Sequence, residues 1–156
     1  MPTADTVFAV ANGLALPAWL ALALSPPRAR WTPWTWRVTG RLLPLAYAIV
    51  YVALLLTAPP APGGGFGSIG EVRALFAVDA ALTAGWIHYL AFDLFVGTWI
   101  ARRAGELGLP HLAVVPLLAL TFLFGPAGLL AFFVLRAVMR PASLKPAFNA
   151  SSGTSR

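Results

Sequence analysis

Three ionisable side chains lie inside an apolar stretch long enough to cross a bilayer, residues 74–100, ALFAVDAALTAGWIHYLAFDLFVGTWI. They are Asp79, His88 and Asp93. Ionisable groups are rare in such segments and by default mark a functional site. A neutral histidine can pass a proton in either direction near neutral pH, and a buried carboxyl can carry one. The three side chains therefore favour proton chemistry on a hydrophobic molecule held between helices.

The spacing of these residues limits which of them can act together. Asp79, Trp86 and Asp93 recur every seven residues and form one stripe along a helix. The two carboxyl groups are separated by ~21 Å along the axis, so they cannot act as a pair on one atom. His88 precedes Asp93 by five residues, which places it about 140° around the helix. We therefore expect His88 to work with a group from another helix.

The same polar residues also allow a structural interpretation, as hydrogen-bonding contacts between helices worth roughly 0.6–2 kcal/mol each. Asn12 lies inside the first apolar run and needs a partner within the bundle. His111 follows Pro110 at the start of another run, where a capping histidine is ordinary. His88, Asp93 and His111 show no spacing typical of a metal site, so neither a metal nor another cofactor is predicted.

The composition predicts the elements that position these groups. With 59% hydrophobic and 10% charged residues, the chain is far more apolar than a soluble domain. We predict an all-α integral membrane protein, with four transmembrane helices in one compact bundle over residues 1–140. The predicted spans are residues 7–24, 42–58, 74–100 and 111–135, and residues 141–156 are predicted to be a disordered tail. An interfacial loop is expected at 25–41 and a flexible connection at 58–70.

The fourth predicted span contains a break, TFLFGPAG, residues 121–128. Pro126 has no N–H to donate to the carbonyl of Phe122, and the flanking glycines ease a bend. The short connection at 101–110 makes the third and fourth spans antiparallel neighbours. We therefore expect the imidazole of His88 to lie beside the break. The predicted substrate-binding residues are Asn12, Asp79, Trp86, Thr121, Gly125 and Pro126.

The net charge of +6 comes from basic residues in short segments between the apolar runs. This placement favours anionic lipid headgroups as partners and argues against nucleic acid, which would need a continuous basic face. Four spans would put both termini on one side and divide the basic residues almost evenly, which leaves the orientation open. A homo-oligomer is also left open.

Residues 88–136 resemble the abscisic-acid-deficiency-type neoxanthin synthase family. The matching pieces are HYLAFDLFVGTWI, the GLPH turn and TFLFGPAGLL. The resemblance implies a four-span protein that, in plants, converts violaxanthin toward neoxanthin by opening an epoxide to an allenic alcohol. That isomerisation needs an acid for the epoxide oxygen and a base for a carbon-bound proton. The family's histidine and aspartate positions correspond to His88, Asp93 and His111, with His88 as the proton shuttle and Asp93 as acid or orienting partner.

The composition is typical of a bacterial protein, and the early first span argues against a plastid transit peptide, so we expect a bacterial inner membrane. Two functions stay open. The first is a cofactor-independent isomerase of a carotenoid, retinoid or related isoprenoid. The second is a non-catalytic pigment- or lipid-binding protein that supports another enzyme, and a transporter or channel is a more distant third.

Overall fold

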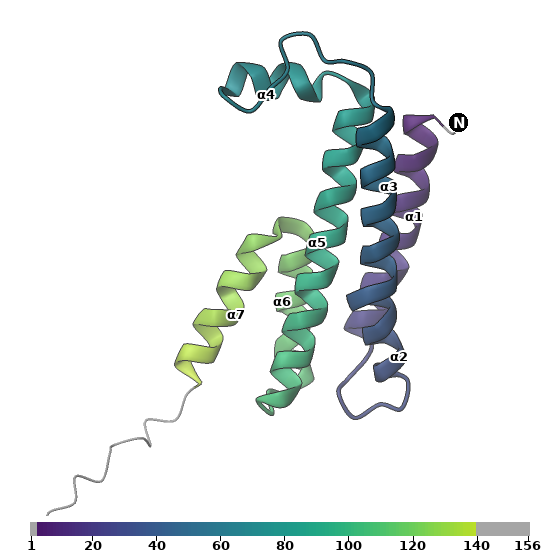
Figure 1. Ribbon diagram of the computed structural model, residues 1–156. Coiled ribbons are helices and arrows are strands. Elements are labelled where there is room, and N and C mark those ends of the chain that lie inside the picture. Colours follow the sequence, from purple (N-terminus) through teal and green to yellow (C-terminus); the bar gives the residue numbers. More distant parts are fainter. Residues whose placement is uncertain (1–2, 140–156) are drawn as a thin grey trace, which may run out of the picture.

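The computed structural model describes residues 3–139, and all the regular secondary structure in this range is helical (Figure 1). The predicted disordered tail lies outside the described residues. The elements in chain order are α1 (Ala4–Ala23), α2 (Thr32–Arg37), the π-helix η1 (Val38–Leu42), α3 (Leu43–Thr57), α4 (Ile69–Phe76), α5 (Asp79–Glu106), α6 (His111–Phe124) and α7 (Pro126–Val138).

Three helical segments among the described residues are long and apolar enough to cross a membrane. They are α1 with 20 residues, the unbroken run Thr32–Thr57 with 26, and α5 with 28. The three lie side by side, and α5 also contacts α4, α6 and α7 (Figure 1). The prediction of a helical membrane protein organised around residues 74–100 is thus confirmed in its main features.

The interfacial loop predicted at 25–41 is wrong from Thr32 onward, because α2 and η1 continue directly into α3. Pro33 lies in the first turn of α2, where the missing N–H has no helical partner to lose. The hydroxyl of Thr32 donates to the carbonyl of Pro26 at 2.7 Å and holds the preceding turn. Gly40 lets η1 approach α5 closely, since a Cβ there would lie 2.8 Å from a methyl carbon of Thr98.

The third predicted span begins five residues later than expected, because residues 69–76 form the separate helix α4. Ser68 caps α4 by accepting from the backbone N–H of Glu71 at 3.2 Å. The carboxylate of Glu71 accepts in turn from the N–H of Gly67, the residue before the cap, at 2.9 Å, so it ties the preceding turn to the start of α4. Helix α4 projects sideways from the upper end of α5 (Figure 1).

The fourth predicted span, 111–135, is not one crossing helix but two short ones that reverse at Gly125. Helices α6 and α7 have 14 and 13 residues. Gly125 adopts φ 45° and ψ −98°, a backbone conformation that would be strained in any residue with a side chain. Helix α7 then runs back beside α6 toward the end where α6 began (Figure 1). A Cβ on Gly128 would overlap Thr121, so the two arms pack backbone to backbone near the turn.

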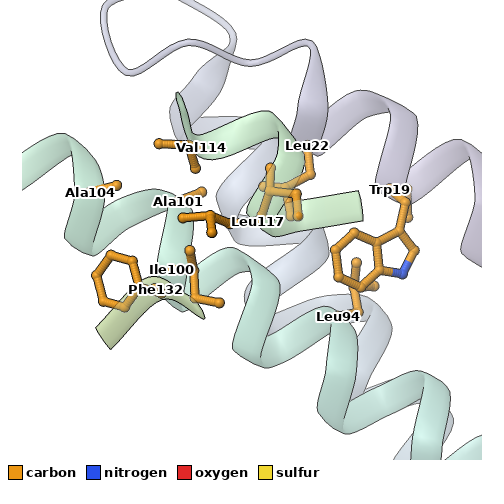
Figure 2. Close-up of a cluster of buried hydrophobic side chains, with 11 residues drawn as sticks. Trp19, Leu22, Leu94, Ile100, Ala101, Ala104, Val114, Leu117 and Phe132 are labelled. Atoms are coloured by element: carbon orange, nitrogen blue, oxygen red, sulfur yellow. The ribbon is translucent and has the colours of Figure 1, made fainter. Parts of the chain in front are cut away.

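The main core lies where this hairpin meets the lower halves of α1 and α5 (Figure 2). Leu22, Leu94, Ile100 and Phe132 have no exposed surface there. Trp19 packs against Gly97, where a Cβ would lie within 2.6 Å of two ring carbons. This core fixes the hairpin against the middle of α5 and so positions the groups described next.

Candidate functional site

The candidate site is built around Asp93, at the midpoint of α5. Its carboxyl lies against the turn of the hairpin, since a Cβ on Gly125 would be 2.8 Å from Oδ1 and 3.0 Å from Oδ2. Oδ2 is buried and has no hydrogen-bond partner among the described residues. Native proteins rarely leave a buried polar atom unpaired, and such an atom often belongs to a catalytic or binding site. The tip of the hairpin thus faces an acid with free bonding capacity.

Tyr89 lies one turn before Asp93 on the same face of α5 and holds the hairpin in place. Its hydroxyl donates to the carbonyl of Phe122 at 3.0 Å. This is the carbonyl that loses its helical donor because Pro126 has no N–H. The phenol therefore occupies the position that the break opens, and it ties α6 to α5 at the level of the acid.

Trp86 and Asn12 form a second polar contact, with Trp86 about one turn before Tyr89 on α5. The indole Nε1 of Trp86 donates to Oδ1 of Asn12 at 3.2 Å, and Nδ2 of Asn12 donates to the carbonyl of Phe8 at 3.0 Å. The rings of Trp86 and Tyr89 lie 5.3 Å apart. The expectation that Asn12 bonds a neighbouring helix is thereby confirmed.

A hollow of about 380 Å³ lies between these two contacts. Its walls come from α1, α5 and α6, and apolar side chains line it around the polar groups. The lining residues are Asn12, Ala15, Leu16, Trp86, Tyr89, Leu90, Phe122 and Leu123. Asp93 lies one helical turn beyond Tyr89. The hollow is thus an apolar slot with a phenol, an indole and an amide in its wall, and the carboxyl of Asp93 lies just outside its lining.

The structure does not place His88 beside the break. Its side chain is exposed and lies on the face of α5 toward α3, where it stacks on Phe92 at 4.5 Å between ring centroids and approaches Tyr51 at 5.7 Å. The predicted height along α5 was right, but one residue turns a helix by about 100°, so Tyr89 and not His88 points to α6. His88 and Asp93 lie on different faces, as their spacing predicts.

The remaining predicted residues are spread over the bundle. His111 begins α6 and its Nε2 is 2.7 Å from the carbonyl of Ala23, so it caps the last turn of α1. Asp79 is exposed in the first turn of α5, far from the hollow. Thr121 is fully buried and its hydroxyl donates to Leu117 at 2.7 Å. Of the candidate set, Asp93, Gly125 and Pro126 meet at the break, while Asn12 and Trp86 meet at the hollow.

Tyr89 is the residue that the sequence interpretation missed. It forms the spacing Trp86, Tyr89, Asp93, at steps of three and four residues that keep all three on one helical face. Trp86 and Tyr89 thus line the hollow, and Asp93 continues their row along α5 toward the turn of the hairpin.

The sequence model of the family described as ABA DEFICIENT 4-like matches residues 6–132. The match covers α1 to α6 and the first half of α7, and therefore every residue of the candidate site. No curated protein and no solved structure matches the chain.

Proposed function

Because the chain belongs to the ABA DEFICIENT 4-like family, which makes it a membrane protein related to neoxanthin synthesis, we propose that it is a membrane-embedded isomerase. Its substrate class is a carotenoid, retinoid or related isoprenoid, bound in the slot between α1, α5 and α6. The observation that carries the proposal is the carboxyl of Asp93. It lies against the turn of a broken helix with a buried oxygen that no group within residues 3–139 satisfies.

One carboxyl group suffices for the proton transfers of an epoxide-to-allene isomerisation. The protonated carboxyl gives its proton to the epoxide oxygen as the C–O bond breaks with its electron pair going to oxygen. The resulting carboxylate removes a proton from carbon, and the C–H electron pair forms the new double bond. The proton count and the oxidation state of the substrate are unchanged, so this isomerisation calls for no redox cofactor.

Tyr89 is a positioning residue in this proposal, because its hydroxyl fixes the carbonyl of Phe122 and with it the turn against Asp93. His88 is given no part in the proton transfer, since it stacks on Phe92 on the opposite side of α5 from the hairpin. Substitutions of Asp93 and of His88 are therefore expected to affect conversion differently, and this difference makes the proposal testable.

The test is expression in cells that accumulate defined carotenoids, followed by chromatography of the pigment isomers. The wild-type chain is expected to produce a new isomer, Asp93→Asn to abolish it, and His88→Phe to retain it. Both variants preserve side-chain volume approximately, and the amount of folded protein in detergent controls for stability. Full conversion by Asp93→Asn would remove Asp93 from the mechanism.

A non-catalytic pigment- or lipid-binding role is the second candidate, favoured by an open apolar groove of about 500 Å³ between α1 and α3. Tyr47 lies in this groove, but its hydroxyl is occupied by the carbonyl of Ala11 at 2.8 Å. In the same cells, unchanged pigments together with one pigment species that co-purifies with the protein would support binding alone.

A further inference from the structure

We infer that the α6–α7 hairpin is re-entrant, so that it enters and leaves the membrane on one side and the chain crosses the bilayer three times. At a rise of 1.5 Å per residue, α6 and α7 are each ~20 Å long, short of the ~30 Å of hydrocarbon. Their reversal at Gly125 means that the two lengths do not add. The turn lies against Asp93 at the midpoint of α5, and hence near the middle of the bilayer.

The burial of the turn supports this topology. Irregular backbone at membrane depth is tolerated only where protein or a cavity satisfies it. Gly125 is buried, and the freed carbonyl of Phe122 is satisfied by Tyr89. Phe132 of α7 packs edge-on against Trp99 of α5. Helix α7 therefore returns along the lower half of α5, sloping away from it toward the end of the bundle where α6 begins (Figure 1).

A three-span topology separates the charges of the described residues sharply. The end of the bundle that holds the α1–α2 and α5–α6 connections carries one acidic residue, Glu106, and these arginines: Arg28, Arg30, Arg37, Arg41, Arg102, Arg103 and Arg136. The opposite end carries Arg73 with Asp5, Glu71 and Asp79. By the positive-inside rule, the arginine-rich end faces the cytoplasm and α1 starts on the outer side.

Cysteine labelling tests both statements cleanly, because the chain has no cysteine. Single variants Pro62→Cys, Leu107→Cys, Met139→Cys and Leu123→Cys are exposed to a membrane-impermeant maleimide in spheroplasts and in inside-out vesicles. Pro62→Cys is expected to react only in spheroplasts, and Leu107→Cys and Met139→Cys only in inside-out vesicles. Leu123→Cys, close to the turn, is expected to react in neither.

Labelling of Met139→Cys from the same side as Pro62→Cys would overturn the re-entrant hairpin and establish four spans. Labelling of Leu107→Cys in spheroplasts alone would show that the protein has the opposite orientation. Reaction of Leu123→Cys in either preparation would place the turn outside the hydrocarbon. These outcomes do not depend on the enzymatic proposal.

A second inference rests on the cavities at the arginine-rich end: we propose that the groove between η1–α3 and α5 binds an anionic phospholipid such as phosphatidylglycerol. Two adjoining hollows share Gly40 and Phe95. The one nearer the end of the bundle, about 250 Å³, is lined by Arg102 and by the ion pair of Arg103 with Glu106. The other, about 500 Å³, runs along Leu45, Ala48 and Phe92.

The charges of this groove match a phosphate above an acyl chain. Arg41 lines the apolar hollow at its lower end and Arg102 lines the polar one, and neither forms an ion pair within residues 3–139, where Arg103 bonds Glu106 at 2.7 Å. Basic pockets between helices at the cytoplasmic side are suited to anionic headgroups.

The test is reconstitution in nanodiscs of equal phosphatidylglycerol and phosphatidylcholine, followed by mass spectrometry of the lipids that stay bound after extraction. The wild type is expected to retain phosphatidylglycerol in excess. Removing both charges with Arg41→Gln and Arg102→Gln is expected to lower its retention about tenfold or more. Ala48→Phe, which fills the apolar hollow, is expected to have a similar effect.

The matched controls are Arg73→Gln at the opposite end and Leu56→Phe on an exposed part of α3 away from both hollows. Both are expected to retain the lipid as the wild type does. Equal retention by the double arginine variant and the wild type would overturn the site, as would equal retention of the two lipids by the wild type.

Discussion

The contact between Gly125 and Asp93 predicts a large effect for the addition of a single methyl group. With alanine at 125, the backbone at φ 45° and ψ −98° carries a Cβ in a region that side chains avoid, at a cost of roughly 1–3 kcal/mol. The Cβ also lies 2.8 Å from Oδ1 of Asp93, and relieving such overpacking costs about 1–3 kcal/mol more. We expect Gly125→Ala to lower the free energy of unfolding by about 2–6 kcal/mol.

The measurement is reversible unfolding of the purified protein in mixed micelles with increasing sodium dodecyl sulfate. Gly13→Ala inside α1 is the matched control, since a Cβ there meets nothing within 4 Å. That change is expected to stabilise by about 0.5–1 kcal/mol, because alanine replaces glycine inside a helix. A Gly125→Ala protein within about 0.5 kcal/mol of the wild type, below the lower bound of the expected range, would refute the reasoning.

A double-mutant cycle separates the two parts of the cost. If the carboxyl of Asp93 is in contact with the added methyl group, Asp93→Ala removes the steric cost of that contact and leaves only the backbone strain at position 125. The loss caused by Gly125→Ala should then be smaller by about 1 kcal/mol or more in the Asp93→Ala background. Strict additivity of the two changes would mean that Asp93 does not touch the turn.

Three further predictions concern contacts that hold the hairpin and the core. Tyr89→Phe leaves the carbonyl of Phe122 unpaired and is expected to destabilise by about 1–3 kcal/mol in the same unfolding assay; a neutral effect would mean that water or lipid replaces the phenol. Gly97→Ala drives a Cβ into the ring of Trp19 and should cost about 1–3 kcal/mol, with a change in tryptophan fluorescence. His111→Phe removes the cap on α1 and is expected to lose about 1 kcal/mol while the folded fraction keeps its conversion activity; loss of activity in folded protein would give His111 a catalytic part.

The helical class and the central helix could be predicted because apolar length depends on local sequence alone. The break at 121–128 was also predictable, since Pro126 removes a helical donor wherever it lies. The direction of the chain after the break was not, because Gly125 can continue or reverse the path with similar ease. The reversal depends on Gly128 packing on Thr121 and on Phe132 packing on α5, contacts that connect distant parts of the sequence.

The error at 25–41 and the error at His88 have different physical origins. The loop was predicted across the whole of 25–41, but Pro33 lies in the first turn of a helix, where its missing N–H has no helical partner to lose. The choice between His88 and Tyr89 depends on which face of α5 meets α6. Both faces of α5 are apolar apart from these side chains, so periodicity alone could not assign the face.

The hairpin also explains why the unpaired oxygen lies at Asp93. A helix that breaks inside hydrocarbon exposes backbone groups, and each unsatisfied group costs several kcal/mol. Tyr89 satisfies the carbonyl of Phe122, but no described group satisfies Oδ2 of Asp93. At the break, the polar atom that is left without a hydrogen bond among the described residues is therefore Oδ2 of Asp93, next to an apolar slot. A substrate oxygen that forms a hydrogen bond with this carboxyl would satisfy it. The same group would then contribute both to substrate binding and to proton transfer.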